Sequence, residues 1–429
     1  MVDADENAVG ARYMNILRTA LVSLVLPAMA FATMAQANDP IQQLLQSRQS
    51  EWSDGFDAAA GSAPAIRRDI PTLSADIVGA LEHAIMQYTQ IVQQGGWPMV
   101  PPEQRLRVGA RGPAVAALRQ RLIVSGDLDA SMGATEAFDT YVDAAVKRFQ
   151  VRHGIAADGV IGESTFAALN VPAAVRLNQL QTNLGRLRAS TKSLPNRFIM
   201  VNIPAAQVEA VENGVVASRH TAIVGKVDRP SPLVNSKIHE INFNPFWTVP
   251  ASIIRKDLIP LMQKDPNYLT NYKIRVYDQK GQELNPANIN WHSDEATRYM
   301  FRQDPGDFNS MGNVKINFPS PDGVYMHDTP GKLMFNNEVR FDSSGCVRIQ
   351  GVRDLVKWIL RDTPNWDPAT IDDMFVNGER VNANVANPVP VFWVYVTAWA
   401  NVDGVVHFRN DIYGQDGLDQ YAQQVGTQL

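Results

Sequence analysis

Residues 325–330 read Tyr-Met-His-Asp-Thr-Pro and residues 343–348 read Ser-Ser-Gly-Cys-Val-Arg, and together these two runs organise the second half of the chain. Cys346 is the single cysteine in 429 residues, and His327 lies 346 − 327 = 19 positions before it. A free cysteine most often acts as a small buried hydrophobe, yet the neighbours of Cys346 are serine, glycine and arginine. We therefore interpret Cys346 as a candidate nucleophile and His327 as its candidate base.

Several features of these runs favour an ionised thiol at Cys346. An imidazole, a cation or a helix N-terminus each stabilises a thiolate. His327 supplies the first and Arg348 the second, and a helix predicted from Val352 to Leu360 supplies the third. The backbone N–H groups of Gly345 and Cys346 are candidates for an oxyanion hole.

The alternation of side chains along a strand predicts which neighbours of His327 share its face. In an extended run, residues two apart share one face, so Tyr325 and His327 point together whereas Asp328 points away. The imidazole is therefore expected to be oriented by a backbone carbonyl, or by the hydroxyl of Ser343 or Ser344. The side chain of Asp328 is not expected to orient it.

The first residues of the chain have the layout of a secretory signal peptide. Arg12 and Arg18 precede an apolar run over 21–31, and the small triplet Ala-Gln-Ala at 35–37 predicts cleavage before Asn38. An uncleaved membrane anchor is the alternative. No later run approaches the roughly 18 apolar residues that a membrane span needs. Export predicts an oxidising compartment, where an unpaired thiol is a liability unless it has a function.

Composition narrows the function classes. The formal net charge is −5, and the segment 1–37 contributes −1, so the remainder carries −5 − (−1) = −4. This mild acidity predicts no nucleic-acid partner. No His-x-x-x-His pattern and no cysteine pair is present, so neither a metal site nor a cofactor is expected, and the other six histidines are interpreted as structural or exposed.

Length and hydrophobic patterning indicate a multidomain α+β protein. Strand patterns, mostly of antiparallel style, are predicted near 198–203, 207–211 and 217–224, and strand character resumes at Val324 after an irregular stretch. A good helix is predicted near 74–94. The predicted parts are a signal peptide (1–37), a helical scaffold (38–101), a three-helix unit (102–171), a catalytic domain (196–384) with an insertion at about 250–320, and a C-terminal hairpin and tail (385–429) that complete the catalytic domain.

The three-helix unit carries a specific pattern of folding residues. It includes Gly112-Pro113-Ala114-Val115, Phe149-Gln150, Asp158-Gly159 and Ala168-Leu169-Asn170. This arrangement resembles the peptidoglycan-binding domain of the three-helix type. A generic helical spacer is the alternative, and whether the unit grips glycan is a separate question, because the pattern mostly records folding residues.

The runs at 325–330 and 343–348, with Phe335 and Arg340 between them, resemble the catalytic motif of L,D-transpeptidases of the YkuD type. The resemblance extends to residues 244–250 and 395–399. With the helical unit and the insertion, the chain is similar to the large periplasmic, YcbB-like subgroup. One departure is Ser344, where much of the wider family has histidine, which leaves His327 as the only base in the motif.

The resemblance implies a reaction and a set of roles. Cys346 attacks the bond between positions three and four of a peptidoglycan tetrapeptide, D-alanine leaves, and a diaminopimelate amine resolves the thioester into a 3-3 cross-link. The insertion is implied to cap the donor site, and carbapenem β-lactams are implied inhibitors of a periplasmic enzyme. The implied substrate-binding residues are Arg348 and Arg340 for stem carboxylates, and Tyr325, Ser343, Ser344, Trp247 and Trp399 around the groove.

Two alternatives stay open at this point. The same dyad serves an L,D-carboxypeptidase or cysteine peptidase that hydrolyses wall peptides, since the sequence does not decide between water and an amine. The chain is alternatively a non-catalytic peptidoglycan-binding protein whose C-terminal domain is a scaffold.

Overall fold

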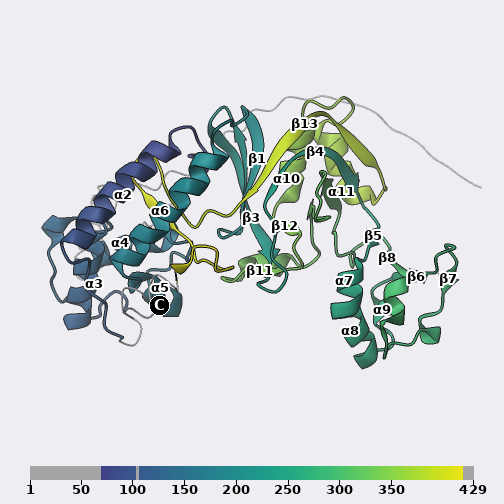
Figure 1. The fold of residues 1–429 in the computed structure, drawn as a ribbon, viewed down its shortest axis with the longest axis horizontal. Helices are drawn as coiled ribbons and strands as arrows, with labels where there is room; N and C mark the ends of the chain where they lie inside the picture. The colour runs from purple at the N-terminus through teal and green to yellow at the C-terminus, as the bar shows by residue number, and fades with distance from the viewer. Residues whose placement is uncertain (1–68, 103–105, 419–429) are drawn as a thin grey trace, which may run out of the picture. The chain divides into compact units, whose positions relative to one another are not determined.

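The computed structural model describes residues 69–102 and 106–418 (Figure 1). The predicted signal peptide and its cleavage site, the first part of the predicted scaffold segment (38–68) and the end of the C-terminal tail lie outside these residues. Within the described part, no helix is both long enough and apolar enough to cross a membrane.

Two long helices and a three-helix module form the N-terminal part. Helix α2 (Ile77–Gln93) agrees with the predicted helix, whereas α6 (Ala173–Ser190), which packs along α2, was not predicted. The module consists of α3 (Pro113–Val124), α4 (Thr140–Arg152) and α5 (Glu163–Leu169), with the 3-10 turn η1 (Ala130–Met132) between α3 and α4. Its core is aliphatic and aromatic, with Leu118, Leu122 and Phe149 fully buried.

A nine-stranded sheet forms the C-terminal part, in the order β11-β3-β12-β10-β9-β4-β13-β1-β2. Three pairings are parallel (β1–β13, β10–β12 and β11–β3) and six are antiparallel, which confirms the predicted α+β class and strand style. Because β2 also pairs with β3, the sequence of pairings closes on itself. The strands are β1 (Arg197–Asn202), β2 (Gln207–Glu212), β3 (Val215–Gly225), β4 (Val234–Phe243), β9 (Val314–Asn317), β10 (Met326–His327), β11 (Phe341–Ser343), β12 (Val347–Ile349) and β13 (Asn382–Val394).

The main core lies on one face of β9, β10 and β12. Val314, Met326 and Val347 belong to it, together with the buried side of α10 (Val352–Leu360) and α11 (Pro368–Asn377). The short 3-10 helix η5 (Lys332–Asn336) lies between β10 and β11. Since α10 packs with the core side chains of β12, it lies on the opposite face from Arg348, whose neighbours Val347 and Ile349 are fully buried.

The insertion is a separate unit with its own core. It consists of a four-stranded sheet, β5-β8-β6-β7, and short helices. Its elements are β5 (Trp247–Thr248), α7 (Ala251–Ile253), the π-helix η2 (Ile254–Leu258), α8 (Ile259–Lys264), α9 (Tyr268–Asn271), β6 (Ile274–Tyr277), β7 (Glu283–Leu284), η3 (Pro286–Asn288), η4 (Asp294–Arg298) and β8 (Met300–Gln303).

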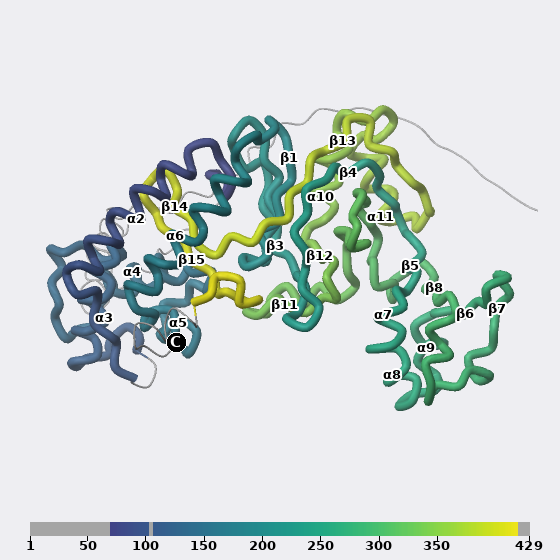
Figure 2. Tube along the Cα trace, in the orientation of Figure 1, coloured from purple at the N-terminus to yellow at the C-terminus, as the bar shows by residue number. Residues whose placement is uncertain are grey.

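Two predicted strand boundaries were wrong. The main sheet resumes at Val314 and not at Val324, because the four-residue strand β9 already pairs with β4 and β10. At the C-terminal end, the expected long hairpin strand is divided after Val394. The hairpin consists only of β14 (Ala398–Ala400) and β15 (Val406–Phe408), which pack against α2, α6 and α4 (Figure 2).

Candidate active site

Strand register brings the predicted nucleophile and base onto one face of the sheet. In the parallel pair β10–β12, Met326 is opposite Val347 and His327 is opposite Arg348. Met326 and Val347 are fully buried in the core, so the residues on either side of them point to the other face. Cys346 is half-buried on this second face, beside Tyr325 and one step along from His327.

His327 is held in one tautomer by the backbone. Its Nδ1 contacts the carbonyl oxygen of Asp328, which only accepts, so Nδ1 carries the proton in the neutral ring, and the ring also interacts with the backbone of Ser310. Burial, together with the positive charge of Arg348, lowers the pKa of His327 to about 3. The ring is therefore neutral at pH 7 and able to accept a proton at Nε2.

The carboxylate of Asp328 is occupied elsewhere. It forms an ion pair with Lys332 and accepts the N–H of Asn313 at 3.1 Å. The expectation that a backbone carbonyl, and not this carboxylate, orients the imidazole agrees with these contacts. The carbonyl belongs to Asp328 itself.

The thiol environment differs from the sequence-based expectation. Burial raises the pKa of the Cys346 thiol, while hydrogen bonds from Tyr325 and the charges of Lys315 and Arg348 act in the opposite direction. In the resting arrangement the thiol is thus protonated beside a neutral imidazole. Among the described residues no direct hydrogen bond joins Cys346 to His327; such contacts often tighten only when substrate is bound.

The loop before the thiol is fixed by its own hydrogen bonds. Gly345 adopts a φ of 109°, which favours glycine, and its carbonyl accepts the hydroxyl of Ser231 at 2.8 Å. The Gly345 N–H donates to Ser343 Oγ at 3.2 Å, and the Ser343 hydroxyl donates to the Cys346 carbonyl. Ser343 therefore shapes the loop. Of the two N–H groups predicted to form an oxyanion hole, that of Gly345 is engaged by Ser343, and that of Cys346 remains available to an oxyanion.

Two of the predicted substrate-binding residues, Tyr325 and Arg348, lie close to the thiol. Tyr325 interacts through its hydroxyl with both Cys346 and Trp247, and burial raises the pKa of Tyr325. Arg348 is half-buried, and its guanidinium contacts Met334 Sδ at 3.6 Å. Burial lowers the pKa of Arg348, with Asp342 and Cys346 opposing the effect. No carboxylate lies within 4.0 Å of this guanidinium in the described ranges.

Arg340 and Trp399 lie elsewhere. They line a cavity of about 570 Å³ that contains none of the residues around the thiol. Trp399 belongs to the hairpin strand β14, which leaves the main sheet after Val394, and its ring stacks on His407 at 4.9 Å. Arg340 donates to the carbonyl of Asn337 at 3.0 Å. The expectations that Arg340 holds a stem carboxylate and that Trp399 lines the groove beside the thiol are therefore corrected.

Sequence reasoning missed two cations close to the site. Arg229 donates to Ser344 Oγ at 3.0 Å and makes a two-point ion pair with Asp257 of η2, with one contact at 2.9 Å. It thereby ties the insertion to the cysteine loop. Lys315 on β9 faces His327 across the strands. The alternation Val-Lys-Ile-Asn at 314–317 was the available signal for this strand.

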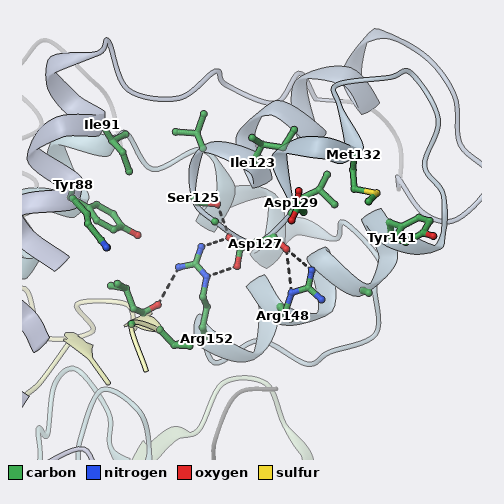
Figure 3. Close-up of a pocket in the computed structure, with 18 of the residues that line it drawn as sticks. Tyr88, Ile91, Ile123, Ser125, Asp127, Asp129, Met132, Tyr141, Arg148 and Arg152 are labelled. Carbon is green, nitrogen blue, oxygen red and sulfur yellow. Dashed lines mark hydrogen bonds and ion pairs between the residues drawn. The ribbon is translucent and has the colours of Figure 1, made fainter. Parts of the chain in front are cut away.

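A further cavity, of about 620 Å³, lies between α2, the three-helix module and the C-terminal hairpin (Figure 3). Its wall contains an ion pair between Arg152 and Asp127. Arg152 donates to Asp127 at 2.7 Å, and Arg148 donates to the backbone carbonyl of Asp127. Tyr88 and Tyr141 contribute to its wall, and none of the predicted site residues does.

Comparison with known proteins places both parts of the chain. Residues 196–372 match the family model described as L,D-transpeptidase catalytic domain (YkuD), and residues 111–169 match that described as putative peptidoglycan binding domain. A putative L,D-transpeptidase of Haemophilus influenzae is 36% identical over 219 residues, which are 51% of this chain and 44% of the relative. The chain thus spans less than half the length of this curated relative.

Solved structures give weaker likenesses. An L,D-transpeptidase from Xylanimonas cellulosilytica is 16% identical, with 68% of this chain and 99% of that chain covered and a TM-score of 0.22. The catalytic domain from the E. faecium L,D-transpeptidase acylated by ertapenem is 12% identical, with 47% and 99% covered and a TM-score of 0.21. On the family models and the sequence relative, the chain carries a catalytic domain of the YkuD L,D-transpeptidase family and a putative peptidoglycan-binding domain.

Proposed function

We propose that this protein is a periplasmic peptidoglycan L,D-transpeptidase that uses Cys346 as nucleophile and forms 3-3 cross-links. The observation that carries the proposal is the placement of the only thiol on one face with His327 and Tyr325, inside a domain that matches the transpeptidase family. The peptidoglycan-binding match at 111–169 supports wall peptide as the substrate. The signal-like residues 1–37 support export.

Acylation begins with transfer of the Cys346 proton to Nε2 of His327. The sulfur then attacks the carbonyl carbon of the third residue of the donor stem, and the Cys346 N–H stabilises the oxyanion. The C–N bond to D-alanine breaks, His327 returns the proton to the departing amine, and a thioester remains. The neutral ring suits this role, because a protonated imidazole cannot accept the proton.

The second half-reaction reverses these movements. A diaminopimelate amine of a second stem attacks the thioester, the new C–N bond forms and the C–S bond breaks. His327 takes the amine proton and returns it to sulfur. Arg348, a half-buried guanidinium with no carboxylate partner in the described ranges, is suited to hold a stem carboxylate during both steps.

The insertion is suited to restrict water. Trp247 at its beginning interacts with Tyr325, and Asp257 is joined to the cysteine loop through Arg229. Exclusion of water favours aminolysis over hydrolysis. We expect a carbapenem to acylate Cys346. The catalytic domain of the E. faecium L,D-transpeptidase has been solved in a form acylated by ertapenem.

The direct test is the mass of products after incubation with disaccharide-tetrapeptide. We expect cross-linked dimers plus D-alanine from the wild type and no product from Cys346→Ala. Tripeptide without dimers would replace the proposal with an L,D-carboxypeptidase. Unchanged substrate with the folded wild type would support a non-catalytic wall-binding protein.

A further inference from the structure

Lys315 is a second half-buried cation on the face that carries the thiol. Strand β9 alternates, with Val314 and Ile316 in the core and Lys315 and Asn317 on the other side. The register places Lys315 opposite His327, which in turn is opposite Arg348. Three charged or titratable side chains therefore form a row across β9, β10 and β12.

The ammonium of Lys315 leans along the strands toward the thiol. Its Nζ lies 4.4 Å from the centre of the Tyr325 ring, and the Tyr325 hydroxyl is hydrogen-bonded to Cys346. A cation over an aromatic face is held in place without being neutralised. Burial lowers the pKa of Lys315, and the charges of Cys346 and Glu240 act in the opposite direction.

No carboxylate neutralises this ammonium. In the described ranges no acidic oxygen lies within 4.0 Å of Lys315 Nζ, and Glu240 on β4 is an acid whose charge acts on it. Glu240 accepts the side-chain amide of Asn317 at 3.0 Å, and the backbone position opposite Lys315 is Asn242. A half-buried cation without an anionic partner favours a nearby anion that forms during function.

We propose that Lys315 is a positioning residue that sets the charge state of the nucleophile, stabilising the Cys346 thiolate when His327 withdraws the proton. This inference rests on the proposed role of Cys346 as nucleophile. The positive charge of Lys315 also lowers the pKa of His327, so the imidazole stays neutral until it takes the thiol proton. Lys315 therefore couples the two partners of the proton transfer.

The pH dependence follows from all groups that face the sulfur. They are Tyr325 just before β10, His327 on β10, Lys315 on β9 and Arg348 on β12, with Glu240, Asp342 and the Arg229–Asp257 pair farther out. Removal of one cation raises the thiol pKa further, so at any pH below that pKa the thiolate fraction falls. One pH unit of displacement lowers this fraction about tenfold.

The experiment is the rate of iodoacetamide alkylation of Cys346 against pH, followed by intact mass on the folded full chain. We expect Lys315→Met to move the midpoint upward, with alkylation at pH 7 about tenfold slower. Lys315→Arg, which keeps the charge, is expected to stay near the wild type. Lys237→Met, which removes an exposed lysine on β4, serves as the matched control and should leave the profile unchanged.

A wild-type profile for folded Lys315→Met would overturn the inference. If that variant does not fold, Lys315→Gln replaces it, with the same expected displacement and the same contrary result. Alkylation requires no wall peptide, so its outcome is independent of the transpeptidation assay. A displaced midpoint without cross-linked product would retain the role of Lys315 in setting the thiol charge and remove the proposed function.

Discussion

Two buried arginines of the helical module have carboxylate partners, whereas two cations of the catalytic face have none among the described residues. In the module, Arg152 and Asp127 form a buried ion pair at 2.7 Å, and the buried Arg119 pairs with Asp139 at 2.8 Å. On the catalytic face, Lys315 and Arg348 are half-buried, and no described carboxylate lies within 4.0 Å of either.

This difference separates structural charges from functional ones. A cation removed from water needs compensation, and a pair supplied by the chain itself holds the fold together. On the catalytic face, we expect the compensating anion to be a thiolate or a substrate carboxylate. The two regions should therefore respond to substitution in opposite ways, one in stability and the other in catalysis.

His327→Gln should produce the largest effect, on the catalytic side. Glutamine retains a donor for the Asp328 carbonyl but cannot act as the base, so D-alanine release should fall about 10²–10⁴-fold. The measurement is turnover of tetrapeptide, with His239→Gln on the exposed side of β4 as the control. Turnover within threefold of the wild type would remove His327 from the mechanism.

Asp127→Asn should produce the largest effect on stability. It leaves Arg152 buried without its anion, and breaking such a pair costs about 3–5 kcal/mol of unfolding free energy. Chemical denaturation measures this, and Asp129→Asn at an exposed position should leave the denaturation midpoint near the wild type. Alkylation of Cys346 below the transition should be unaffected. Loss of thiol reactivity in folded Asp127→Asn would contradict the claim that charges of the module affect stability but not the catalytic face.

Arg348→Met, on the catalytic face, should affect catalysis and not stability. It removes a desolvated cation that has no carboxylate partner in the described ranges, so stability should hold or rise. Loss of a charged hydrogen bond to substrate, worth about 1.5–3 kcal/mol, should reduce kcat/KM roughly 10–150-fold. Kinetics with tetrapeptide and thermal denaturation test both halves. Marked destabilisation with unchanged kinetics would make Arg348 a structural residue.

Asp328→Asn should have the smallest effect. The carbonyl that holds His327 remains, and only the ion pair with the exposed Lys332 is lost, so turnover should stay within about threefold of the wild type. Parallel assays of Asp328→Asn and His327→Ala test this. A loss in Asp328→Asn as severe as in His327→Ala would return the carboxylate to the mechanism.

Local sequence patterns predicted much of the fold. Alternation and the turn at Gly214 predicted β1 to β3, and apolar spacing predicted α2 and α10. Strand β9 was missed because four residues give a weak period-two signal, and its pairing with β4 and β10 is a long-range property. Helix α6 was not predicted at all, although its apolar side packs on α2.

The residues of the candidate site also fall into those that local sequence patterns predicted and those that they did not. Cys346, His327 and Tyr325 were placed together from spacing and alternation, since they lie on, or immediately before, two strands that pair directly. Arg340 and Trp399 were misplaced because nearness in sequence, or likeness to a motif, does not fix which face a side chain occupies. Lys315 and Arg229 reach the site through tertiary contacts that no local pattern records.

Intact-protein mass spectrometry after brief incubation with disaccharide-tetrapeptide tests the central claim most directly. The account predicts a covalent adduct equal to the donor minus D-alanine, located on the peptide that contains Cys346 and absent from Cys346→Ala. Cross-linked product formed with no adduct on Cys346, or formed equally by Cys346→Ala, would contradict it.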